Sequence, residues 1–200
     1  MAQDQKQESI IQAAIKRFAH FGVSKTTMSE IAADLSLSKA SLYYYFPDKL
    51  NLYAEVLRSI TSAGEQEDDE ALAREKDPFA AINFFLERRT EFIIKYHNIL
   101  EFLKAYKASG VPEELQQVFT HLRKRELHRI TMIIEKGIAS GQFKIKEAKK
   151  TAELFFDFLD GFRASTLHNN PNFFPDKKQF QQIMKKEIEF ARIFFNGLTI

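Results

Sequence analysis

Three consecutive tyrosines, followed by a phenylalanine and a proline, stand out within the stretch SKASLYYYFPDK at residues 38–49. Neighbouring residues on a helix point about 100° apart, so the three phenol side chains cannot all face one core. A phenol that faces outward can donate a hydrogen bond to a phosphate oxygen, while its ring contacts a sugar or a thymine methyl group. The pattern therefore predicts a surface that contacts duplex DNA.

The other residue types that carry chemistry point to no reaction. The 200 residues include no cysteine, which excludes disulfides, thiolate metal sites and cysteine nucleophiles. None of the five histidines forms an HExxH motif or a comparable ligand pair. His121 and His128 lie seven residues apart in the basic segment HLRKRELH, which is typical of a solvated helix face. We therefore expect no catalytic residue, no metal site and no cofactor.

Composition indicates a folded domain whose charge is distributed rather than concentrated. Hydrophobic residues make up 44% and charged residues 28% of the chain, and 29 Lys and Arg stand against 27 Asp and Glu. With a net charge of only +2, contact with DNA would depend on locally placed basic groups. The polar start MAQDQKQES and the lack of a long apolar run predict a cytoplasmic protein with no membrane partner.

The elements that must position the tyrosines are short helices. Apolar residues recur at three- and four-residue steps from Ile10 to Phe21, which predicts an amphipathic helix that ends at Gly22. Either Thr26 or Thr27 can cap a second helix, and Glu30 completes a capping box with Thr27.

Ser38 can cap a third helix over residues 39–45, and Asp48 can cap a fourth. Leu42 and Phe46 face inward on the third helix, so the tyrosines turn outward. Two short helices joined by a tight turn and braced by a third form a helix-turn-helix.

The remaining chain is also predicted to be helical, which makes the fold class all-α. Residues 64–77 are strongly charged, and we expect a solvated loop or helix extension there. Five further helices are predicted near residues 78–96, 99–107, 112–140, 147–168 and 176–198. The segment at residues 142–145 is too short to predict a sheet.

The N-terminal quarter resembles the DNA-binding domain of TetR-type transcriptional regulators. The resemblance rests on four motifs: the A-x-x-x-F helix followed by a glycine, TTM-x-x-IA, the LS-SK-x-x-LY turn and YFPDK. Three residues depart from the family pattern. Ala40 and the turn residues Ser36 and Leu37 occupy places where many members carry glycine.

The resemblance implies a three-helix DNA-binding domain at residues 1–48 and a larger helical domain for ligand sensing and dimerisation at residues 49–200. It also implies a homodimer that binds a palindromic operator in double-stranded DNA. By matching positions, base edges and nearby backbone would be contacted by Lys39, Ala40, Ser41 and Tyr43. Phosphates would be held by Thr27, Tyr44, Tyr45 and Lys49.

The resemblance further implies an effector of unknown identity, which we expect to be a small apolar or amphipathic molecule. Arg89 and Glu126 fall within apolar stripes, where an unpaired charge is costly. They either hold polar groups of such a ligand or pair with each other or with neighbouring residues; a further alternative is that Arg89 extends its charged group to the edge of the bundle. The aromatic residues suit a pocket that would contain Phe84, Arg88, Phe92, Tyr96, Phe119, Phe155 and Phe158.

The segment near residues 147–168 is apolar on most sides and needs two partners. The resemblance places dimerisation on the last two helices, where the interface residues would be Phe158, Gly161, Phe162, Met184, Ala191 and Phe194. Filling of a single monomer core is the alternative for these aromatic residues. A helical interaction protein, or a small-molecule-binding protein without ligand-controlled DNA release, remains the alternative function.

Overall fold

The computed structural model describes residues 2–106, 110–168 and 177–199. The chain forms two compact units, one of residues 1–64 and 95–122 and one of residues 65–94 and 123–200. We call them the first and the second unit. The first unit therefore contains, besides the helix-turn-helix, the fourth helix and a later segment of the chain.

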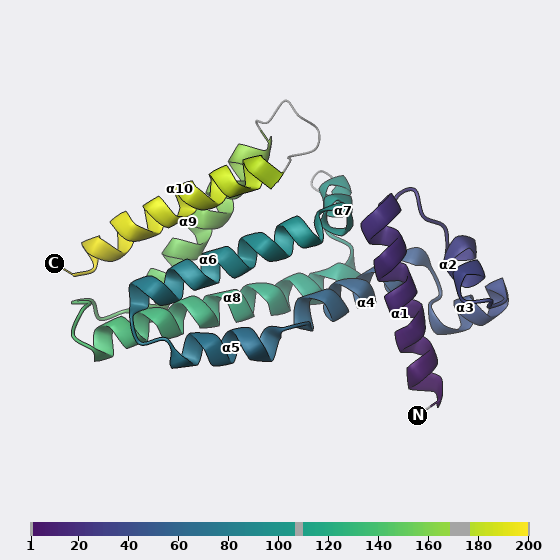
Figure 1. Ribbon diagram of the computed structural model, residues 1–200, viewed down its shortest axis with the longest axis horizontal. Helices are drawn as coiled ribbons and strands as arrows, with labels where there is room; N and C mark the ends of the chain where they lie inside the picture. The colour runs from purple at the N-terminus through teal and green to yellow at the C-terminus, as the bar shows by residue number, and fades with distance from the viewer. Residues whose placement is uncertain (1, 107–109, 169–176, 200) are drawn as a thin grey trace. The chain divides into compact units, whose positions relative to one another are not determined.

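Every regular element in the described part of the chain is helical, as the sequence predicted (Figure 1). The α-helices are α1 (Ala2–Phe21), α2 (Met28–Asp34), α3 (Lys39–Tyr45), α4 (Lys49–Ser62), α5 (Glu65–Arg74), α6 (Pro78–Lys95), α7 (His97–Leu100), α8 (Glu113–Ala139), α9 (Ala148–His168) and α10 (Lys177–Gly197). A 3-10 helix, η1, covers Glu101–Tyr106. None of these helices is long and apolar enough to cross a membrane.

Local capping chemistry sets the boundaries of α2, α3 and α4, and the predicted caps are confirmed. Thr27 forms a capping box with Glu30, Ser38 caps α3 and Asp48 caps α4. Helix α1 ends before Gly22, which has a φ of 81° and can adopt this left-handed conformation without a steric cost.

Helix α4 is held in the first unit by a buried tyrosine. The Tyr53 ring packs edge-on against Phe18 of α1 and against Phe102 of η1. Its hydroxyl donates a hydrogen bond of 2.9 Å to the backbone carbonyl of Ile99.

The prediction of a single helix at residues 99–107 is wrong. The segment is divided between α7 and η1, and Lys107 lies outside the described residues.

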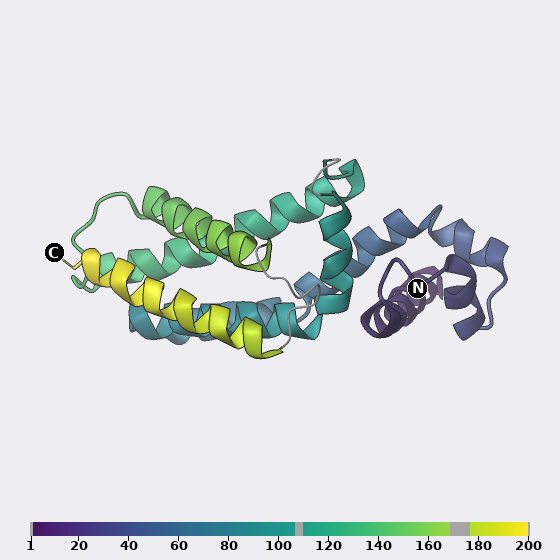
Figure 2. The ribbon, with the colours of Figure 1, turned by 90° about the horizontal axis from the view of Figure 1, so that it is seen from above.

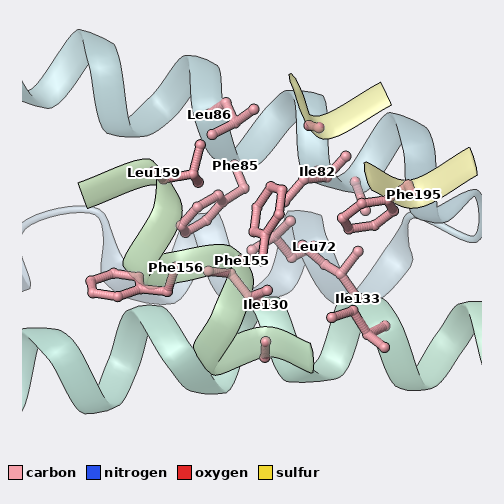
Figure 3. Packing of buried hydrophobic residues seen from close by; sticks show 14 of the residues in the cluster. Leu72, Ile82, Phe85, Leu86, Ile130, Ile133, Phe155, Phe156, Leu159 and Phe195 are labelled. Atoms are coloured by element: carbon pink, nitrogen blue, oxygen red, sulfur yellow. The ribbon is translucent and has the colours of Figure 1, made fainter. Parts of the chain in front are cut away.

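The second unit is built around one apolar cluster contributed by α5, α6, α8, α9 and α10 (Figure 3). Phe155 and Phe195 are fully buried at its centre, with their ring centroids 5.4 Å apart. Helices α9 and α10 pack side by side and run in opposite directions (Figure 2). The predicted last helix begins at Lys177 in the described residues, and Asp176 lies outside them.

The prediction of a solvated loop or helix extension at residues 64–77 is corrected by the structure. It forms a separate helix, α5, whose Leu72 is buried in the second unit. Three of its acidic residues face arginines from α6 and α8 rather than solvent alone. These pairs are Arg88–Asp68 at 2.8 Å, Arg129–Asp69 at 2.6 Å and Arg125–Glu65 at 3.0 Å. Pairing with arginines distant in sequence explains how so charged a segment can pack.

Candidate DNA-binding surface and interior charge cluster

Helix α3 has one anchored face and one open face. Leu42 and Phe46 are buried, while Tyr43 and Tyr44 are 38% and 74% exposed. Lys39 and Ala40 are exposed one turn earlier, and Ser41 and Tyr45 are half-buried. The Lys39 ammonium lies 5.7 Å from the centroid of the Tyr43 ring. The predicted DNA-contacting side chains of this helix are thus gathered on an accessible surface.

The caps hold the helix-turn-helix rigidly from within. The Ser41 backbone N–H donates to the Ser38 hydroxyl at 3.0 Å, so one of the free N–H groups at the start of α3 has an acceptor within the chain. The Thr27 hydroxyl donates to a Glu30 carboxylate oxygen at 2.8 Å. The bonds from Thr27 hold the pKa of Glu30 below its usual value, which keeps this cap charged. Thr27 itself is exposed, as a phosphate contact requires.

Lys49 lies at the first position of α4 and bonds to the turn between α1 and α2. Its ammonium donates to the backbone carbonyls of Val23 at 3.0 Å and Thr26 at 3.1 Å. An ammonium has three donors, so one N–H remains for the phosphate expected from the sequence. The sequence offers no signal for this second role, because the acceptors are backbone atoms more than twenty residues away.

Arg17 of α1 is a structural residue of this surface that sequence reasoning missed. It bonds twice to Asp34 at the end of α2, with Nη2 and Oδ1 2.9 Å apart, and its Nη1 lies 3.5 Å from Glu30. The bond from Arg17 lowers the pKa of Asp34. The only available signal was a pair of acidic residues four apart on α2, which calls for a basic partner.

Arg89 and Glu126, whose roles the sequence leaves undecided, are both paired within the second unit. Arg89 donates to Asp160 at 3.1 Å, and its Nε lies 3.5 Å from Glu126. Glu126 is also 3.8 Å from Arg129 on the same helix. A structural role therefore accounts for Glu126, whereas the Nη1 atom of Arg89 has no hydrogen-bond partner among the described residues.

A second arginine, Arg163 of α9, forms a buried ion pair that the sequence did not suggest. Its Nε donates to Glu187 Oε1 at 2.9 Å, and Nη2 donates to Oε2 at 2.5 Å and to Thr90 at 3.3 Å. Burial is the main cause that lowers the pKa of Arg163, followed by repulsion from Arg89. Periodicity alone did not single out Arg163 or Glu187, because each is one of many polar residues on its amphipathic helix.

The predicted pocket residues are only partly brought together. Phe155 lies in the core of the second unit, with Phe84 packed against that core, and Arg88 is bound by Asp68 and Glu91. Tyr96 and Phe119 belong to the first unit. Phe92 is half-buried and Phe158 is 60% exposed.

A hollow of about 240 Å³ lies between α9 and α10. It is lined by Phe158, Leu159, Phe162, Lys186, Glu187 and Phe190. Of the predicted pocket, it contains only Phe158, whose ring stacks on Phe190 at a centroid distance of 5.0 Å. In the described part of the chain, no group of acidic or histidine residues is arranged to hold a metal ion.

The residues predicted for dimerisation differ in their accessibility. Gly161 is exposed, and Phe162, Met184 and Phe194 are half-buried. The prediction that Ala191 lies in the dimer interface is corrected. Ala191 is fully buried in the core of the second unit, since α10 turns this small residue toward the other helices. Two residues that were not predicted, Leu154 and Ile193, are 58% and 62% exposed on the same two helices.

Comparison with known proteins agrees with this geometry. Residues 10–56 match the family described as bacterial regulatory proteins, tetR family. The transcriptional regulator QacR of Staphylococcus aureus is 24% identical over 197 residues, which cover 96% of this chain and 97% of QacR.

Solved structures extend the likeness over the whole chain. A transcriptional regulator from Cytophaga hutchinsonii superposes with a TM-score of 0.85 at 30% identity, covering 98% of this chain and 99% of that one. Thermus thermophilus FadR, a TetR-family repressor solved in complex with lauroyl-CoA, superposes with a TM-score of 0.68 at 16% identity, covering 97% of this chain and 95% of that one. At the latter identity the likeness concerns the fold alone.

Proposed function

The chain belongs to the TetR family of DNA-binding transcriptional regulators, and from that premise we propose that it acts as a homodimeric repressor on a palindromic operator. A small apolar or amphipathic ligand bound in the larger helical domain releases the protein from DNA. We propose no catalytic activity and no cofactor, and we place this function in the cytoplasm.

The open face of α3 is the observation that carries the DNA-binding part of the proposal. Helix α3 is short, with seven residues, and an α-helix with its side chains is about 10–12 Å across, which fits a major groove about 12 Å wide. We propose that Lys39, Ala40, Ser41 and Tyr43 meet base edges and the backbone beside them. Thr27, Tyr44, Tyr45 and Lys49 then hold phosphates on either side of the groove.

Exposed apolar residues support the homodimer. Leu154, Phe158 and Ile193 are large side chains left open on α9 and α10 of a single copy. A two-fold axis through this face would bury them against their equivalents and would set the spacing of two α3 helices. Two recognition helices related by such an axis read a palindrome.

A ligand response is supported by the family, and the coupling would run through the dimer. A ligand that favours a different spacing of the two α3 helices weakens operator binding by its preference for that state. FadR of Thermus thermophilus, which was solved with lauroyl-CoA, is a precedent for an amphipathic ligand in this fold.

Selection of bound duplexes from a random DNA pool tests the proposal. We expect a palindromic consensus, together with a dimer in sedimentation experiments. Tyr43→Ala should change the preferred sequence, whereas Tyr44→Ala should weaken binding to all duplexes alike. A monomer that selects no consensus would favour the alternative of a helical interaction protein.

A further inference from the structure

Two arginines of the second unit share one buried carboxylate. Arg163 uses its Nε and Nη2 atoms on Glu187, which is fully buried. Arg89 approaches the same carboxylate, with its Nη1 3.9 Å from Glu187 Oε1. The hydrogen-bond acceptor of Arg89 is instead Asp160, whose side chain is 61% exposed. Arg89 Nε also lies 3.5 Å from the largely buried Glu126, so the two guanidinium groups face the carboxylates of Glu187 and Glu126 inside the unit.

Both arginines also keep a terminal nitrogen without an acceptor. Arg89 Nη1 and Arg163 Nη1 are buried and make no hydrogen bond within the described residues. A buried donor that has given up water and found no acceptor is costly, and the cost is greater for a charged group. Repulsion between the two guanidinium groups adds to that cost, as the lowered pKa of Arg163 indicates. An added anion would relieve both.

The hollow between α9 and α10 adjoins this cluster, because Glu187 belongs to both. Its other walls are Phe158, Leu159, Phe162 and Phe190, with the exposed Lys186 beside them. A water molecule occupies about 30 Å³ in the liquid. A hollow of about 240 Å³ therefore holds a chain of about eight non-hydrogen atoms.

We propose that the cluster and the hollow together bind a small amphiphile with a carboxylate head group. The carboxylate accepts hydrogen bonds from the unpartnered guanidinium nitrogens of Arg89 and Arg163, and the apolar chain lies among the phenylalanines of the hollow. A cationic amphiphile is disfavoured, because it offers no acceptor and both oxygens of Glu187 are already bound by Arg163. The inference rests on the proposed function only in taking this molecule as the effector.

Phe158 gives the ligand a route to the DNA-binding state. It is a wall of the hollow and also part of the exposed face proposed for the homodimer. A ligand that moves this ring therefore changes the contact between the two copies directly. Occupancy of the hollow is thereby coupled to the spacing of the two α3 helices.

Three probes of equal chain length isolate the head group: octanoate, 1-octanol and octylammonium, titrated into the intact protein at neutral pH. Calorimetry measures the affinity of each. We expect octanoate to bind at least about ten-fold more tightly than either of the others, since hydrogen bonds between charged groups in a buried site are worth that factor or more. Equal affinities, or preference for the ammonium, would overturn the proposal.

Arg89→Gln identifies the residue responsible. Arg89 donates to the exposed Asp160 and lies 3.5 Å from Glu126, whereas Arg163 holds Glu187 through two hydrogen bonds of its own, so the variant leaves the Arg163–Glu187 pair intact. We expect it to lose the preference for octanoate while its affinity for octanol stays the same. Arg89→Lys, which keeps the charge, should retain part of the preference. The control Arg123→Gln removes an arginine that pairs with Asp157 on the exposed side of the same unit, and should behave like the parent protein.

Operator binding is measured in parallel, so that the two proposals fail separately. If the protein binds no DNA, the proposed function fails, while the octanoate preference still decides the ligand site. If octanoate binds with the expected preference but leaves operator affinity unchanged, the site stands and its role as effector site is wrong. An Arg89→Gln variant that keeps the full preference would contradict the assignment of the site.

Discussion

The ammonium of Lys49 can reach a phosphate only with the one N–H that Val23 and Thr26 leave free. This residue therefore combines a structural role with the proposed phosphate contact, and the two can be separated. Lys49→Met should weaken binding to all duplexes and reduce the slope of log affinity against log salt by about 1.8 on a palindromic operator, the value of one phosphate contact from each of two copies. It should also lower the free energy of unfolding by about 1 kcal/mol, since two half-buried carbonyls lose their donor.

Salt titrations of DNA binding and urea unfolding measure these two effects. Lys16→Met is the matched control, because Lys16 is exposed on α1. Its stability should stay within about 0.5 kcal/mol of the parent protein. An unchanged salt slope in Lys49→Met, combined with a loss of stability, would leave Lys49 with the structural role alone.

Ser36 occupies a conformation that suits glycine. Its φ of 53° lies in the left-handed region, and it sits in the turn of the helix-turn-helix, where glycine is common in the family. Ser36→Gly should therefore raise the free energy of unfolding by about 0.5–1 kcal/mol, after allowance for the extra freedom of glycine in the unfolded chain. Urea unfolding tests this, and Ala33→Gly, inside α2, should have the opposite sign.

Residue-level prediction succeeded where the chemistry is local. Thr27, Ser38 and Asp48 were identified as caps because a cap and its acceptor or donor lie three residues apart. The partners of Arg17 and Lys49 were not, because folding alone brings those groups together. The exposed face of α3 was likewise predictable, because Leu42 and Phe46 are close in sequence and mark the buried side. The Arg163–Glu187 pair was not, because no residue near either partner in the sequence indicates it.

At the level of elements, α8 is joined to the following segment by one close approach. A Cβ atom added to Gly137 would lie 2.1 Å from a ring carbon of Phe143, which is buried in the core of the second unit. The Phe143 N–H also donates to the Gly137 carbonyl at 3.0 Å, so the ring cannot move away freely. This contact accounts for a glycine inside a long helix.

Gly137→Ala should therefore lower the free energy of unfolding by about 1–3 kcal/mol through overpacking, although alanine is the better helix former. Gly161→Ala in α9 is the matched control, because nothing lies within 4 Å of its added Cβ in one copy. It should raise the free energy of unfolding by about 0.5–1 kcal/mol. Thermal or urea unfolding gives both signs, and a stabilised Gly137→Ala would contradict this packing.

Helix positions were predictable from apolar periodicity, which identified α6, α8, α9 and α10 to within a few residues. Helix α5 was missed as a packed element because six of its ten residues are charged. Three of its acidic residues are neutralised by Arg88, Arg125 and Arg129, which follow later in the chain. A charged segment can thus be predicted as solvated only when no distant partner is available.

For the whole molecule, the proposed operator binding depends on two copies. Leu154 and Ile193 are large, exposed and outside the hollow, so changing them tests the dimer without touching the proposed ligand site. Leu154→Glu and Ile193→Glu should each leave the fold intact, because in one copy these side chains already face solvent. Two glutamates brought together across a two-fold axis would oppose association by desolvation and repulsion.

Sedimentation should therefore give a monomer for each variant, with an unchanged far-UV spectrum. Affinity for the palindrome should fall by about 100-fold or more, because the second half-site is no longer bound at a high effective concentration. Affinity for an isolated half-site should not change. Lys149→Glu, an exposed change at the start of α9, is the control and should remain dimeric. Dimers of normal operator affinity in both glutamate variants would place the contact between copies on another face.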